Sequence, residues 1–143
     1  MMKTIHSYWA YLVLSVLVLA VVNAIIGFVK KREFSDKDLR IGLFTLIFSH
    51  IQLLIGLGWY FSSPYFKALK TNGSEVMGDS ATRLLAVEHP IMMIIALVLI
   101  TIGWSKHKKK TEDASKFKTF VIFYGIALVL ILARIPWNQW PTF

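Results

Sequence analysis

Three of the four histidines, His6, His50 and His89, lie within or at the edge of long apolar segments. A bilayer core offers no water to an imidazole, so a histidine at that depth is unfavourable unless it is paired, faces a cavity or binds a ligand. The chain has no cysteine, which excludes thiolate metal sites, iron–sulfur clusters and c-type haem attachment. Histidine is therefore the natural metal ligand here, and the three histidines are the first candidates for function.

The elements that must position these histidines are predicted by hydrophobic run length. Of the 143 residues, 56% are hydrophobic and 14% are aromatic, values typical of an integral membrane protein. About 20 helical residues cross a hydrocarbon core, and four runs are long enough. No period-2 alternation indicates a β-barrel. We expect an all-α fold, a transmembrane four-helix bundle that forms one domain over residues 1–143, with spans at about 8–29, 41–61, 84–104 and 117–135.

Basic residues are distributed unevenly among the connections. Residues 30–40 and 106–118 are rich in lysine and arginine, whereas the longer connection 62–83 carries only three basic residues. The positive-inside rule therefore predicts that both basic loops are cytoplasmic and that the N-terminus and C-terminus lie outside. The formal charge of +8 is explained by these loops and the anionic lipid beside them, so nucleic acid is not an expected partner. We expect a multi-pass protein of the bacterial inner (cytoplasmic) membrane.

Helix geometry limits which histidines can share a ligand. At about 1.5 Å of rise per residue from the basic ends of the spans, His89 lies in the outer leaflet, His6 near the outer boundary and His50 near the midplane. His89 is then equally distant in depth from the other two. The rise per residue leaves two pairs open, His6 with His89 and His50 with His89.

Simpler roles are open for the same side chains. His50 can bond to Gln52, Ser49 or a backbone carbonyl between helices, as polar residues in membrane helix packing often do. His50 with Gln52 would also suit a quinone as hydrogen-bond partners. His107 lies in a run of lysines, and we expect it to be solvated.

Three short motifs resemble parts of the haem A synthase family. Residues 4–10, Thr-Ile-His-Ser-Tyr-Trp-Ala, are similar to the start of a haem-ligating helix in that family. Residues 51–56, Ile-Gln-Leu-Leu-Ile-Gly, resemble an element of the following helix, and residues 87–90, Val-Glu-His-Pro, resemble the helix with the second histidine ligand. The order matches one half of that family's fold. The chain also resembles small four-helix membrane proteins described as cytochrome b-like.

The resemblance implies that His6 and His89 are the axial ligands of one haem b near the outer face, with His50 as the alternative to His6. An arginine follows the first ligand in the family, but Ser7 stands at that position here. A b-type haem carrier is therefore the inference, rather than an enzyme that oxidises a haem methyl group.

Two further residue types suit a haem on physical grounds. Gly56 and Gly58 present no side chain and would let a flat macrocycle approach the second span. Arg134 is a cation in the outer leaflet, where a guanidinium could bind a haem propionate. Snorkelling to the interface is the other role open to Arg134.

The leading hypothesis is a b-type haem-binding membrane protein that transfers electrons or carries haem. The alternative is a cofactor-free accessory or assembly subunit of a larger membrane complex, in which the histidines hold helices together. The expected partners are the lipid bilayer and either a respiratory or other membrane complex or a second copy of the chain.

Overall fold

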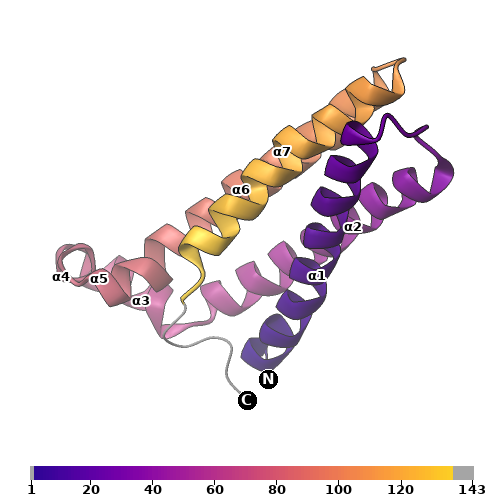
Figure 1. Cartoon of the computed structure of the whole chain (residues 1–143). Helices are drawn as coiled ribbons and strands as arrows, with labels where there is room; N and C mark the ends of the chain where they lie inside the picture. The colour runs from indigo at the N-terminus through magenta and orange to yellow at the C-terminus, as the bar shows by residue number, and fades with distance from the viewer. Residues whose placement is uncertain (1, 137–143) are drawn as a thin grey trace.

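The computed structural model describes residues 2–136, and every regular element in that part of the chain is a helix (Figure 1). The prediction of an all-α fold is confirmed for these residues. Residue 1 and residues 137–143 of the predicted domain lie outside the described part. They include the C-terminus, which was predicted to lie on the outer side of the membrane. The elements in chain order are α1 (Met2–Val29), α2 (Asp36–Phe61), α3 (Pro64–Thr71), α4 (Gly73–Gly78), α5 (Ser80–Arg83), the π-helix η1 (Leu84–Glu88), α6 (His89–Lys108) and α7 (Asp113–Arg134).

Four helical segments are long and apolar enough to cross a membrane. They comprise Thr4–Val29, Asp36–Phe61, Ser80–Lys108 and Asp113–Arg134, the third being the continuous run of α5, η1 and α6. Large apolar side chains cover their outer surface, as on Leu54 and Val129, which are 70% and 63% exposed. An apolar exterior over four long helices is that of a multi-pass membrane protein.

The long helices pack in a ring in which each contacts two neighbours. α1 packs on α2 and α7, and α6 packs on α7 and α2. Figure 1 shows α1 close to α7 near the loops that follow α1 and α6, and separated from it toward the N-terminus. The short helices α3, α4 and α5 lie at the opposite end of the molecule from those loops (Figure 1).

Small residues facing aromatic rings let the helices approach closely near the loops. A Cβ added to Gly27 would lie 2.5 Å from the Phe117 ring, and one added to Gly42 would lie 2.8 Å from the Phe120 ring. The buried Tyr124 hydroxyl donates a 2.9 Å hydrogen bond to the Gly42 carbonyl. Close approach at small residues and interhelical hydrogen bonds are typical of membrane helix packing.

A buried carboxylate fixes the turn between α1 and α2. Asp38 is 4% exposed and accepts hydrogen bonds from Asn23 Nδ2 and Arg32 Nη2, both at 2.7 Å. It also accepts bonds from the backbone N–H and the hydroxyl of Ser35, the N-cap of α2. Every oxygen of this carboxylate is therefore satisfied, and the first turn of α2 is tied to α1.

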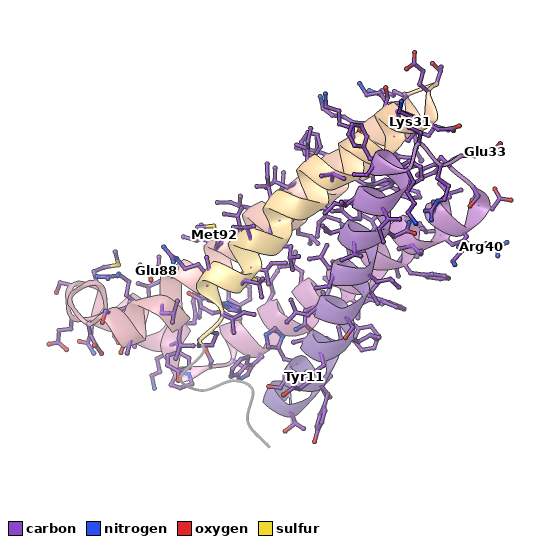
Figure 2. The ribbon with its side chains drawn as sticks, in the orientation of Figure 1. Tyr11, Lys31, Glu33, Arg40, Glu88 and Met92 are labelled. Carbon is purple, nitrogen blue, oxygen red and sulfur yellow. The ribbon has the colours of Figure 1, made fainter. Side chains whose placement is uncertain are left out.

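Charged side chains gather at the loop end of the helices. Figure 2 labels Lys31, Glu33 and Arg40 there, whereas Tyr11 and Glu88 lie far from that end. The loop between α6 and α7 reaches the same end (Figure 1). Both lysine-rich connections therefore lie on one side of the bundle.

The expectation that His107 is solvated is wrong. Its side chain is 2% exposed, and its Nδ1–H donates to the Trp104 carbonyl. The imidazole packs against the rings of Trp104 and Phe120, with centroids 4.6 and 4.5 Å away, and against Phe34 at 5.7 Å. The lysines beside it in the sequence point outward, because successive helical residues are about 100° apart around the axis.

Candidate functional site

A cavity of about 170 Å³ lies between the helices where α1 separates from α7. α1, α2, α6 and α7 all contribute to its walls. Among the described lining residues none carries a carboxylate, ammonium or guanidinium group, and most are apolar. His6 and His89 face this cavity from α1 and α6.

The two imidazoles lie opposite each other. Their ring centroids are 6.4 Å apart and their planes are nearly perpendicular, at 88°. The indole of Trp59 packs beside His6, with ring centroids 5.5 Å apart. The structure thus brings together His6 and His89, one of the two pairs that the rise per residue left open.

His89 begins α6 directly after the π-helical turn. Its backbone N–H donates to the Leu84 carbonyl, five residues earlier. Pro90 has no N–H to donate to the Ala86 carbonyl, and that carbonyl instead accepts a 2.6 Å hydrogen bond from the Tyr60 hydroxyl. Tyr60 on α2 therefore stabilises the irregular turn that positions His89.

The ring of His89 is held by the end of α7. Its Nδ1 lies 2.8 Å from the backbone carbonyl of Arg134. A carbonyl only accepts, so Nδ1 carries the proton and Nε2 has a free lone pair. This is the arrangement in which protein histidines bind metals, with one nitrogen donating to a carbonyl and the other on the metal.

His6 is positioned by α2. Gln52 Nε2 donates a 2.9 Å hydrogen bond to the His6 carbonyl, although that residue is within helix α1. A Cβ added to Gly56 would lie 3.0 Å from Cε1 of His6, so the absence of a side chain at this glycine makes room for the imidazole. Nδ1 of His6 is buried and has no hydrogen-bond partner among the described residues.

His50 lies apart from this pair. It is exposed on the outer face of α2, and its Nδ1–H donates a 2.7 Å bond to the Leu46 carbonyl one turn earlier. This contact lies within α2 and does not join two helices. His50 does not line the cavity with His89.

The other candidates occupy different positions around the site. Gly56 faces the His6 ring, and Gly58 is exposed. Arg134 contributes its backbone carbonyl to His89, while its guanidinium donates to the Ala133 carbonyl on the exposed side. The guanidinium and the imidazole of His89 therefore lie near the same end of α7.

The spacing of the two imidazoles fits one metal ion between them. A bond from an imidazole nitrogen to a metal is about 2.0–2.1 Å, as in zinc sites, so two rings on opposite sides of one ion have centroids roughly 6.3 Å apart. The observed value is 6.4 Å. No group of three or more His, Asp or Glu side chains able to hold a metal occurs in residues 2–136, so these residues alone do not form a complete metal site.

Sequence reasoning missed Tyr60 and the inward direction of Ser49 and Gln52. All three line the cavity from α2, together with Gly56. These positions are three or four residues apart and form one stripe of the helix. A search for small and polar residues at that spacing would have found them and placed His50 outside the stripe.

No protein-family model, curated protein or solved structure matches this chain.

Proposed function

We propose that this chain binds haem b between α1 and α6, with His6 and His89 as the two axial ligands. One observation carries the proposal: the imidazoles face each other across a cavity with ring centroids 6.4 Å apart, the spacing that one metal ion between them requires. The porphyrin of a bound haem would supply four nitrogen ligands to the iron, and His6 and His89 would be the ligands that the protein provides.

The walls of the cavity support an apolar ring system. The cavity measures about 170 Å³, below the roughly 300–1,000 Å³ typical of cofactor pockets, so haem binding would need the surrounding helices to move further apart. Leu53, Leu97 and Ile131 supply apolar walls that would exclude water from the ring. Arg134, whose backbone carbonyl bonds His89, carries a guanidinium that could reach a propionate at the end of α7.

Bound haem b would supply reversible one-electron transfer. The protein's part is to fix the ligands. The Arg134 carbonyl holds the proton on Nδ1 of His89 and makes Nε2 a better donor to the metal. Gly56 leaves room for the His6 imidazole, because a Cβ at this position would lie 3.0 Å from Cε1 of that ring.

The proposed setting is the bacterial inner membrane. The positive-inside rule places the lysine-rich loop end in the cytoplasm and the histidine pair near the outer face. In this setting the chain would pass electrons to, or deliver haem to, a respiratory or other membrane complex, or act as a homo-oligomer.

The test is an absorption spectrum of the purified protein. The wild type should give a reduced-minus-oxidised spectrum of six-coordinate haem b, and His6→Ala and His89→Ala should each abolish that low-spin signal. His50→Ala is the matched control, because it removes an exposed histidine from α2, and it should keep the spectrum. A preparation that takes up no haem under any expression condition would falsify the proposal.

A second candidate function is that of a cofactor-free subunit of a membrane complex. The hydrogen bond from His89 to the Arg134 carbonyl favours it, because this bond joins α6 to α7 without any cofactor. A colourless protein that co-purifies stoichiometrically with other subunits, and loses stability but no absorbance on His89→Ala substitution, would support this candidate.

A further inference from the structure

Two polar atoms in the α2 wall of the cavity have no hydrogen-bond partner within residues 2–136. Ser49 is 5% exposed, and its Oγ makes no hydrogen bond among the described residues. Oε1 of Gln52, one turn further along α2, is also buried without a partner. Both residues line the cavity. Unpaired buried polar atoms that border a cavity indicate a ligand or ordered water that pairs with them.

The hydrogen bond of Gln52 defines what that ligand must offer. Because Nε2 donates to the His6 carbonyl, the amide orientation is fixed and Oε1 is left as a pure acceptor. Oε1 therefore needs a ligand that donates. The Ser49 hydroxyl can donate to the same ligand, so a group that both donates and accepts satisfies the two side chains together.

The rest of the cavity sets the size and polarity of the ligand. Apart from the two histidines, which could be protonated, its described lining residues carry no charged group. Leu53, Val13 and Leu14 are among the apolar side chains that line it. A cavity of about 150 Å³ lined by apolar side chains can hold a benzene molecule. This cavity, at about 170 Å³, is large enough for one such ring.

We propose that Ser49 and Gln52 form a binding site for a neutral lipophile with a hydroxyl group. The O–H of this ligand would donate a hydrogen bond to Gln52 Oε1, and its oxygen would accept a hydrogen bond from the Ser49 hydroxyl. A phenol or hydroquinone ring and an alkyl alcohol share this chemistry. The site uses α2 residues other than the haem ligands proposed above, but it lies in the same cavity, so the lipophile would bind the haem-free protein.

The probe pair is 4-butylphenol and 4-butylanisole. In the anisole a methyl group replaces the hydroxyl hydrogen, so this compound can accept a hydrogen bond but cannot donate one. Full-length protein in lipid nanodiscs, purified without added haem, is titrated with each compound, and the thermal unfolding midpoint is followed by circular dichroism. A ligand of the folded state raises that midpoint with concentration, which yields Kd. The phenol should bind more tightly than the anisole, and 1-hexanol as a third arm distinguishes a ring ligand from an alkyl alcohol.

Ser49→Ala removes one hydrogen bond and little volume. It should weaken phenol binding by about threefold to tenfold, and anisole binding to a similar degree, because the ether oxygen can also accept a hydrogen bond from Ser49. Ser105→Ala, an exposed serine on α6, is the matched control and should leave both affinities unchanged. Gln52→Met provides a second variant that keeps the side-chain length and should also weaken phenol binding.

Two results would overturn the proposal. One is equal binding of phenol and anisole to the wild type, which would mean that ordered water satisfies both atoms. The other is unchanged phenol binding in both Ser49→Ala and Gln52→Met. Because the readout is thermal unfolding rather than haem absorbance, the phenol titration tests this site alone, and the absorption spectrum tests the haem proposal separately.

Discussion

The hydroxyl of Tyr60 donates a 2.6 Å hydrogen bond to the backbone carbonyl of Ala86, joining α2 to the π-helical turn before His89. Pro90 leaves that carbonyl without its usual donor four residues later. Ala86 is 1% exposed, so water does not replace the missing donor. The Tyr60 hydroxyl therefore replaces the N–H that Pro90 lacks, and this bond ties the turn before His89 to α2.

Tyr60→Phe should destabilise the protein by about 1–3 kcal/mol, because it leaves the buried Ala86 carbonyl unpaired while keeping the ring. Unfolding by sodium dodecyl sulfate, followed by circular dichroism, measures this change. In haem-loaded protein the variant should also broaden or shift the Soret band, because His89 follows the affected turn.

Tyr65→Phe is the control for the tyrosine substitution. Tyr65 also lines the cavity, but no hydrogen bond of its hydroxyl is observed among the described residues. It should change stability much less than Tyr60→Phe. Equal effects of the two substitutions would mean that the bond to Ala86 contributes no net stability.

Pro90→Ala should reduce the contribution of the Tyr60 hydroxyl to the free energy of unfolding. The new N–H at position 90 can donate to the Ala86 carbonyl, so Tyr60→Phe in the Pro90→Ala background should cost about 1 kcal/mol less than in the wild type. A double-mutant cycle of unfolding free energies measures this coupling. Strict additivity of the two substitutions would contradict the role assigned to Tyr60.

The helices could be predicted from the sequence because bilayer crossing depends on run length and composition. Each helix extends beyond its apolar run, as where α2 begins at Asp36 rather than near residue 41. The first turn of α2 is polar and is capped by Ser35 and Asp38, so hydropathy does not detect it. Capping residues rather than hydropathy locate this helix end.

The choice between His6 and His50 could not be made from depth. Rise per residue gives the height of a side chain in the bilayer but not the direction in which it points around the helix. His50 follows Ser49, which lines the cavity, and so points about 100° away from it. The π-helical turn η1 also changes the direction in which His89 points, because it contains more residues per turn than an α-helix. In the sequence, Pro90 was the only local signal of this irregular turn.

Asp38→Ala should destabilise the loop end of the bundle by about 2–3 kcal/mol, because it removes an N-terminal cap of α2 and the hydrogen bonds from Asn23 and Arg32. Asp36→Ala, in the same turn but exposed, is the control and should have little effect. Detergent unfolding measures both. The haem spectrum should be unchanged in folded Asp38→Ala protein, since the substitution lies at the far end of the bundle from His6.

Gly56→Ala should disturb His6 without unfolding the protein. The added Cβ would lie 3.0 Å from Cε1 and 3.4 Å from Nδ1 of His6, so the imidazole must move by a few tenths of an ångström. A ligand shifted by this amount weakens its bond to a metal, and we expect a lower haem content and a partial high-spin spectrum at nearly normal helicity.

Gly125→Ala is the matched control, because a Cβ there meets nothing within 4 Å. Alanine is the better helix former, so that variant should be more stable by about 0.5–1 kcal/mol and keep the wild-type spectrum. If Gly56→Ala kept the wild-type haem content and low-spin spectrum, His6 would not be the ligand on α1.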